Sequence, residues 1–384
     1  MASPHAARSA LDAIVDNAAR ARAAGTALQV RVSGPGGMLY ARDAGMTRVT
    51  GLDGEPPPAP VTAATRFDLA SLTKPLCTTA LILLLVRERR LALDEPPPAP
   101  APAGVTVRHL LAHASGLPAW RPFHEAFHDH PEAPPPSART AILQAAAAEP
   151  PECAPGEKTM YSDLGFIVLG WAIAQAAGAR LDAWFAERIA APLGLADRLG
   201  FRPARASAAP EDAANFAATE RCPWRGRVLA GEVHDDNAWA MGGVAGHAGL
   251  YGDADAVDRL ARVFCDTASG RAPTAALFDP DLLRAFWQPA PFPPPARTLG
   301  WNLPAHEGYS AAGSLLSRTA VGHTGFTGTS VWIDPESGLA VTLLTNRVHP
   351  SRSAEGGIRA LRPVLHDGAV SLARASGVGP LSSG

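Results

Sequence analysis

Apolar and polar residues near the N-terminus follow first a helical period and then a strand period. Residues 6–24 read as a surface helix, and Gly25 ends the pattern. Leu28, Val30 and Val32 then alternate with polar neighbours, which predicts a half-buried strand. A Gly-Pro-Gly-Gly turn follows and should lead the chain into a second strand.

A second pair of strand-like runs lies near the C-terminus. Residues 329–334 and 339–346 flank a Pro-Glu-Ser-Gly turn, which predicts a hairpin. A last helix is expected over residues 355–375, with Pro363 as the position of a kink. Strand patterns therefore lie towards both ends of the chain.

The middle of the chain, residues 91–249, shows helical patterns separated by proline-rich breaks and few strand signals. Strands at both ends with helices between them predict an α/β fold, in which an antiparallel sheet flanked by helices is interrupted by an all-helical insertion. We expect residues 1–90 and 250–384 to form the sheet domain and residues 91–249 to form the insertion. A binding site is expected in a cleft between the two parts.

Composition and charge narrow the class of partner. The chain of 384 residues is 47% hydrophobic and 18% charged, which is typical of a globular protein, and its formal net charge is -2. No basic field favours nucleic acid or anionic lipid. The longest apolar run, residues 80–86, is much shorter than the roughly 20 residues of a membrane span. A small molecule is therefore the expected partner.

Cysteine usage and the N-terminal residues bear on location. The four cysteines form no CxxC pair and have no metal-ligand spacing, so neither a disulfide framework nor a zinc site is predicted. Free thiols fit a reducing compartment. Charged residues interrupt the first 25 residues, where a secretory signal would need an apolar core. The sequence therefore predicts a cytoplasmic protein.

One serine and one lysine stand at a spacing that suits nucleophilic catalysis. Ser71 opens an apolar segment that reads as a buried helix, and Lys74 follows one turn later on the same face. A lysine can take the proton of a serine hydroxyl, whereas arginine, with a pKa above about 12, cannot. Only two of the 34 basic residues are lysines, so a lysine here is informative. Alternatively, Ser71 only caps the helix and Lys74 is a solvated charge.

Two later segments complete a set of motifs. A Tyr-Ser-Asp triplet at 161–163 precedes an apolar helix over 164–177, and a His-Thr-Gly triplet at 323–325 precedes the C-terminal hairpin. Together with Ser-Leu-Thr-Lys at 71–74, they resemble the serine β-lactamase and penicillin-binding protein family, in the branch of class C β-lactamases, DD-peptidases and related esterases. The resemblance spans about residues 27–350. It implies a β-lactamase/transpeptidase-like fold and a site without metal or cofactor.

The resemblance also implies a role for each matched residue. Ser71 would attack a carbonyl carbon to form an acyl-enzyme, and Lys74 and Tyr161 would move its proton. Backbone N–H groups of Ser71 and Phe326 would form the oxyanion hole. The residues that would contact substrate are Asp163, the His-Thr-Gly triplet and the residue that follows it, which are His323, Thr324, Gly325 and Phe326.

Two positions depart from the family pattern. Asp163 stands where the family usually has an asparagine that contacts substrate and the lysine. An acid there could pair with Lys74, raise the lysine pKa and leave Tyr161 as the better general base, or it could only cap the helix that begins at Leu164. His323 replaces the lysine of the usual Lys-Thr-Gly. Some peptidases of the family have histidine there, which points away from a β-lactamase.

A second cluster, of histidines and aspartates, has residue types that can bind a metal ion, but its spacing does not favour a metal site. His234, Asp235, Asp236 and His247 lie close together in the sequence. They lack the His-Glu-x-x-His spacing of zinc hydrolases, and the glycine-rich segment around His247 is typical of a tight loop near a cleft. We expect no metal here, and we leave open whether His234 or Asn237 contacts substrate.

The motifs favour one function and leave two alternatives. The leading interpretation is a serine hydrolase that acts on esters, small amides or peptides. A DD-peptidase or class C-type β-lactamase is the nearest alternative, which the expected cytoplasmic location weakens. A catalytically inactive relative that binds a ligand in the cleft is the second, although such a protein would not need all of Ser71, Lys74 and Tyr161.

Overall fold

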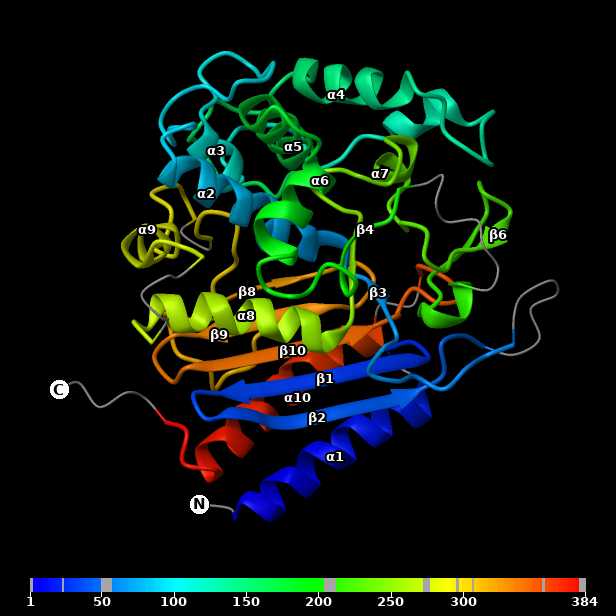
Figure 1. Ribbon diagram of the computed structural model, residues 1–384, viewed down its shortest axis with the longest axis vertical. Helices are drawn as coiled ribbons and strands as arrows, with labels where there is room; N and C mark the ends of the chain where they lie inside the picture. The colour runs from blue at the N-terminus through cyan, green and yellow to red at the C-terminus, as the bar shows by residue number, and fades with distance from the viewer. Residues whose placement is uncertain are drawn as a thin grey trace.

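A five-stranded antiparallel sheet with the strand order β2-β1-β10-β9-β8 forms the centre of the fold (Figure 1). The computed structural model describes residues 3–22, 24–49, 57–203, 212–271, 277–294, 297–305, 307–353 and 356–379. The strands are β1 (Ala27–Gly34), β2 (Gly37–Gly45), β8 (Val321–Thr324), β9 (Ser330–Asp334) and β10 (Leu339–Thr345). Both hairpins that the sequence predicts, β1-β2 and β9-β10, are present.

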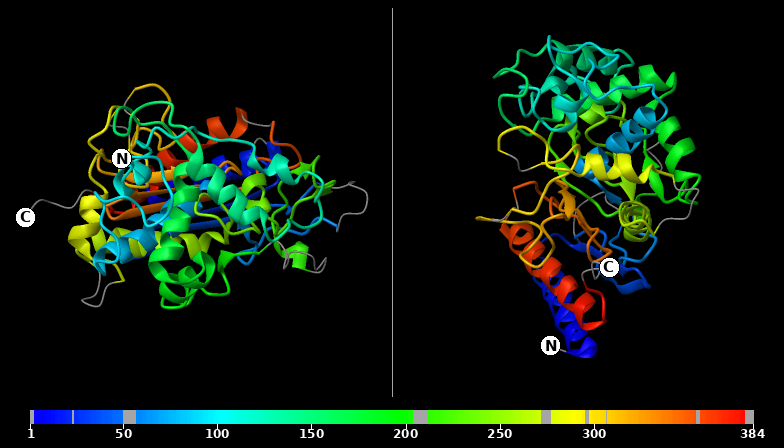
Figure 2. Two further views of the ribbon diagram at one scale, coloured as in Figure 1. Left: turned by 90° about the horizontal axis from the view of Figure 1, so that it is seen from above. Right: turned by 90° about the vertical axis from the view of Figure 1, so that its left-hand side faces the viewer.

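Helices cover both faces of this sheet. α1 (Pro4–Ala21) and α10 (Gly356–Ala375) lie side by side on one face, and α8 (Ala254–Ala268) lies on the other (Figure 1, Figure 2). The two ends of the chain are joined by the pairing of β1 with β10. The predicted fold class, an α/β protein with an antiparallel sheet flanked by helices, is confirmed. Pro363 lies inside α10, and residue 355, where this helix was expected to begin, is outside the described residues.

Strand β1 is buried along its whole length, and the prediction of a half-buried strand is wrong. Its apolar residues join the core under α1 and α10, as their alternation predicts: Leu28, Val30 and Val32. Its polar residues face α8, where Arg31 forms an ion pair with Asp255 and the Ser33 hydroxyl donates to Asp258 at 2.7 Å. Polar partners more than two hundred residues away in sequence therefore cover the second face.

The middle of the chain is mostly helical and also contains short strands. The helices outside the sheet layers are α2 (Ala80–Arg87), α3 (Val107–Leu111), α4 (Ala138–Ala148), α5 (Asp163–Ala177), α6 (Leu181–Phe185), α7 (Asp236–Ala240) and α9 (Pro280–Phe286). The short strands are β3 (Phe67–Asp68), β4 (Leu199–Phe201), β5 (Arg221–Cys222), β6 (Arg227–Val228) and β7 (Leu250–Gly252). β4, β5 and β6 fall within residues 91–249, so this region is not all-helical. The domain boundaries stay a prediction, because one apolar core runs through α2, α5 and α8.

The segment that carries Ser71 forms part of this core. It passes without a break through a 3-10 turn, η1 (Ala70–Leu72), a π-helical turn, η2 (Lys74–Thr79), and α2. Its 18 residues are long and apolar enough to cross a membrane, but 83% of this stretch is buried inside the structure, as in a core helix. α5 and the helix after it pass the same test only as a pair bent by 73°.

A buried histidine in α10 is expected to make the stability of the protein depend on pH. The His366 ring lies between Ser330 Oγ and Ala311 O, and burial lowers its pKa from 6.5 to about 4. The unfolded chain therefore binds a proton at this residue before the folded chain does, and stability is lost as the pH falls below 6.5. We expect acidification from about pH 7.5 to about pH 5 to reduce the free energy of unfolding by about 2 kcal/mol through this residue.

Urea unfolding at the two pH values measures this loss. The His366→Gln variant lacks the titrating ring and should lose less stability than the wild type over the same interval, whatever its stability at neutral pH. Equal losses in the two proteins would show that His366 does not cause the dependence.

Candidate active site

Ser71 lies in a strained turn at the start of the core helix. The residue before it, Ala70, has a φ of 47°, a left-handed conformation that is uncommon outside glycine, and its N–H donates to Asp68 Oδ1 at 2.8 Å. Pro75 has no N–H to donate to the carbonyl of Ser71, so the segment begins as 3-10 and π turns instead of a regular α-helix. The N-cap residues of the two turns are Leu69 and Thr73, so the alternative in which Ser71 serves only as a cap is wrong.

Lys74 is fully buried and directed at Ser71. Its Nζ donates to Ser71 Oγ at 3.1 Å and to the carbonyl of His247 at 3.0 Å, and it forms an ion pair with Asp163 Oδ1 at 2.7 Å. Burial alone would lower the pKa of Lys74, but the charge of Asp163 and the neighbouring Tyr161 raise it above its usual value. The side chain is thus held as an ammonium ion and is not a solvated charge.

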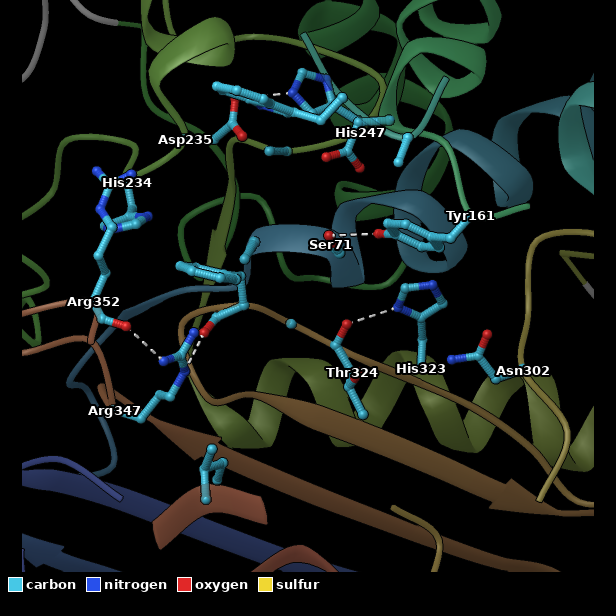
Figure 3. Close-up of a pocket in the computed structure, with 18 of the residues that line it drawn as sticks. Ser71, Tyr161, His234, Asp235, His247, Asn302, His323, Thr324, Arg347 and Arg352 are labelled. Atoms are coloured by element: carbon cyan, nitrogen blue, oxygen red, sulfur yellow. Dashed lines mark hydrogen bonds and ion pairs between the residues drawn. The ribbon is translucent and has the colours of Figure 1, made fainter. Parts of the chain in front are cut away.

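Tyr161 approaches Ser71 from the loop before α5 (Figure 3). Its hydroxyl donates to Ser71 Oγ at 2.9 Å. Burial raises the pKa of Tyr161, and Lys74 offsets part of this rise. Ser162 is the N-cap of α5, since its hydroxyl accepts the N–H of Gly165 at 3.2 Å. The alternative in which Asp163 caps this helix is therefore wrong, and the pairing of Asp163 with Lys74 is what the structure shows.

His323 lies on β8 beside Tyr161, with 6.1 Å between the two ring centres (Figure 3). Burial, together with the charges of Lys74 and Arg297, holds its pKa well below the usual value, so the imidazole is neutral. Its Nδ1 lies 2.9 Å from the carbonyl of Thr324 and donates to it, which leaves Nε2 as an acceptor. Thr324 and His323 both line the pocket described below.

The loop after β8 is attached to the turn that carries Ser71. Thr329 Oγ1 donates to the carbonyl of Leu69 at 3.1 Å, and Thr327 Oγ1 donates to the carbonyl of Asp68 at 2.7 Å. A Cβ atom at Gly325 would lie 2.1 Å from Thr329 Oγ1, so only glycine allows this approach. Phe326 lies in the same loop with 46% of its surface exposed. The oxyanion hole made by the N–H groups of Ser71 and Phe326 stays a prediction.

These residues surround a cavity of about 710 Å³. Of the predicted set, all but Lys74, which lies behind Ser71, line it. The sequence did not predict much of its outer wall. That wall is contributed by loops and by α10, through Trp120, Arg297, Asn302, Tyr309, Arg347, Arg352, Arg359 and Arg362. No local motif marks these positions, because they come from segments that only the fold brings together.

The histidines of the second cluster are held by carboxylates. His247 Nε2 lies 2.9 Å from Asp235, and His234 Nε2 lies 3.1 Å from Glu220. Within the described parts of the chain, no group of three or more His, Cys, Asp or Glu side chains is placed to hold a metal ion. His234 and His247 line the pocket, whereas Asn237 is buried away from it.

The charge of Asp163 should set the pH range of the reaction. Asp163 raises the pKa of Lys74 and, after the larger effect of burial, that of Tyr161. Asp163→Asn removes this charge, so both pKa values fall and the reactive form persists to lower pH. We expect the acidic limb of the pH profile of kcat/KM to move down by about one unit.

The profile can be measured with a p-nitrophenyl ester. Asp182→Asn is the matched control, because Asp182 is also paired with a cation, Arg180, but lies outside the pocket. An acidic limb that stays in place in Asp163→Asn would show that this carboxylate does not act on the titrating pair.

Comparisons with known proteins find relatives over most of the chain. A family model described as Beta-lactamase matches residues 11–366. N-acetylmuramyl-L-alanine amidase from Bacillus subtilis (strain 168) is 32% identical over 322 residues, which cover 76% of this chain and 70% of the relative. A putative D-alanyl-D-alanine carboxypeptidase from Escherichia coli (strain K12) is 28% identical over 326 residues, 76% of this chain and 71% of the relative.

Solved structures show the same fold. EstCE1, a hydrolase with promiscuous acyltransferase activity, superposes with a TM-score of 0.70 at 21% identity and covers 96% of this chain and 99% of its own. Unliganded simvastatin synthase (LovD) from Aspergillus terreus gives a TM-score of 0.69 at 20% identity, with 97% and 99% covered. The family match extends over nearly the whole chain, and the motif-based resemblance is confirmed. The chain belongs to the beta-lactamase family and is a serine hydrolase.

Proposed function

We propose that Ser71 forms an acyl-enzyme with a small amide, peptide or ester that carries a carboxylate. One observation carries the assignment of the nucleophile: Ser71 Oγ lies 2.9 Å from Tyr161 Oη and 3.1 Å from Lys74 Nζ at the wall of the pocket. A serine hydroxyl becomes nucleophilic when a positioned base takes its proton, and these two groups are within hydrogen-bond reach.

The hydroxyl proton of Ser71 is transferred as the bonds at Ser71 form and break. As Oγ bonds to the substrate carbonyl carbon, its proton passes to the Lys74–Tyr161 pair. Asp163 keeps Lys74 as an ammonium ion, which favours Tyr161 as the acceptor, and the reactive form is the fraction in which Tyr161 is ionised. The tetrahedral intermediate then expels the leaving group, which takes this proton. Water attacks the acyl-enzyme by the same steps and releases Ser71.

Arginines in the pocket support a substrate with a carboxylate. Arg359 and Arg362 project from α10 into the cavity, and no carboxylate among the described residues forms an ion pair with either. Arg362 donates instead to the carbonyls of Gly325 and Thr329, beside the proposed oxyanion hole. A carboxylate on the substrate would supply the missing charge. The names of the two relatives, an amidase and a carboxypeptidase, point to the same amide class.

A neutral ester is the second candidate, and the mouth of the pocket favours it. Trp120, Tyr309 and Phe326 expose 41%, 38% and 46% of their surfaces there. Exposed aromatic side chains can bind an apolar acyl or alcohol group.

A panel of substrates tests the proposal. We expect an acyl-D-alanyl-D-alanine peptide to be hydrolysed at least about tenfold faster, in kcat/KM, than the same peptide with an amidated C-terminus. A chromogenic cephalosporin and p-nitrophenyl esters complete the panel. Equal rates for the two peptides would reject carboxylate recognition, and faster turnover of the neutral esters would favour the second candidate. The cytoplasmic location stays a prediction, which cell fractionation would check.

A further inference from the structure

Arg297 places a cation beside the ring of Tyr161. Its guanidinium lies 5.2 Å from the ring centre, lines the pocket, and donates to Asn302 Oδ1. The backbone of Asn302 pairs with Gly322 of β8 in both directions, at 2.8 and 2.9 Å. The hydrogen bond to Asn302 therefore holds the guanidinium of Arg297 next to the strand that carries the His-Thr-Gly motif.

Within the described parts of the chain, this cation has no carboxylate as a counter-charge. Burial lowers the pKa of Arg297, and the group that opposes this effect is Tyr161. Among the described residues, no carboxylate lies within ion-pair distance of its guanidinium. A partly buried cation without a carboxylate is unfavourable, and an anion that forms beside it relieves this cost. An ionised Tyr161 would be that partner.

The other charges around Tyr161 cancel. Lys74 carries a positive charge 5.0 Å from the ring centre, and Asp163 neutralises it at 2.7 Å from Nζ. Arg297 therefore leaves one positive charge in excess next to Tyr161. Without Arg297, the groups around an ionised Tyr161 would carry no net positive charge.

The two histidines that pack against Tyr161 add no charge. The ring of His113 lies 4.6 Å from that of Tyr161, and its Nδ1 accepts the N–H of Ser162 at 3.0 Å. Burial, then Arg297 and Lys74, hold the pKa of His113 well below the usual value, and His323 is neutral for the same reasons. His323 stands where the family usually has a lysine, so the cation missing from β8 is present on the neighbouring segment.

We propose that Arg297 is a positioning residue that stabilises the ionised form of Tyr161 during proton transfer. This inference rests on the proposed role of Tyr161 as proton acceptor. In this role Arg297 acts on Tyr161, and it does not need to contact the substrate.

Ionisation of Tyr161 can be followed directly. The chain has four tyrosines, and burial raises the pKa of Tyr40 above its usual value and that of Tyr251 well above it. Tyrosinate absorbance during alkaline titration, compared with the Tyr161→Phe variant, therefore isolates the signal of Tyr161. We expect its midpoint to rise by at least about one pH unit in Arg297→Gln and to stay near the wild-type value in Arg297→Lys, which keeps the charge. Arg297→Met keeps the apolar stem and replaces the glutamine variant if that does not fold.

Kinetics with p-nitrophenyl acetate, which has no carboxylate, separate this role from substrate binding. Arg297→Gln should lower kcat/KM at neutral pH by at least about tenfold and move the acidic limb of its pH profile upward, with recovery in Arg297→Lys. Arg87→Gln, which removes a charge from the far end of α2, should leave the profile unchanged.

Two results would overturn the inference. One is an unchanged tyrosinate midpoint in Arg297→Gln. The other is a loss confined to KM for carboxylate-bearing substrates, which would assign Arg297 to substrate binding. Failure of the proposed function is distinguishable, because it would appear as activity in a Ser71→Ala variant, whereas the titration needs no turnover.

Discussion

Replacing Ser71 with alanine is expected to abolish turnover, with a loss of about four orders of magnitude or more in kcat/KM. The reason is geometric: among the described residues, Ser71 Oγ is the hydroxyl that contacts both Tyr161 and Lys74 at the pocket wall. Thermal stability should change little, because the Ser71 hydroxyl does not cap the helical segment that it begins. A fluorophosphonate probe should add its mass to the peptide that contains Ser71.

A control serine makes this result specific. Ser269 is partly buried at the end of α8 and bonds to the carbonyl of Cys265, away from the pocket. The fluorophosphonate probe should label Ser71 in the Ser269→Ala variant to the same extent as in the wild type. Labelling at another serine, or labelling that persists in Ser71→Ala, would overturn the assignment of the nucleophile.

Sequence patterns predicted the parts of the fold that local chemistry determines. The hairpins at the two ends follow from an alternating strand near the N-terminus and two strand-like runs near the C-terminus, each joined to a Gly- and Pro-containing turn. α5 follows from an apolar run between Ser162 and Gly178. The second face of β1 was missed because Arg31 and Ser33 find their partners on α8, which no local pattern reveals. The short strands β4, β5 and β6 have two or three residues each, too few to show a period.

The same distinction applies to the site. Three short motifs located Ser71, Tyr161 and His323, because each carries a recognisable spacing. The role of Asp163 was left open between a cap and an ion pair, and only the geometry could decide, since Ser162 stands one residue earlier and caps the helix equally well. Arg297 carries no motif, and its proximity to Tyr161 arises from the pairing of its segment with β8.

The proton relay yields the second large effect, the replacement of Lys74 by arginine. If Lys74 only neutralised Asp163, arginine would keep the charge and activity would fall little. If it must hold a compact ammonium between Ser71 and Tyr161, arginine is too bulky for a site in which the side chain is 0% exposed, and too basic to exchange a proton. We therefore expect Lys74→Arg to reduce kcat/KM by at least about 100-fold.

Tyr161→Phe tests the other half of the relay, since it removes only the hydroxyl that contacts Ser71. Its loss should equal or exceed that of Lys74→Arg, because Asp163 holds Lys74 protonated and so favours Tyr161 as the base. The double variant should be little worse than either single variant, because both residues serve one proton transfer. Thermal unfolding of each variant controls for misfolding. Near-wild-type turnover in Lys74→Arg would defeat the relay even if Ser71 proved to be the nucleophile, since the structure would then require only a charge at this position.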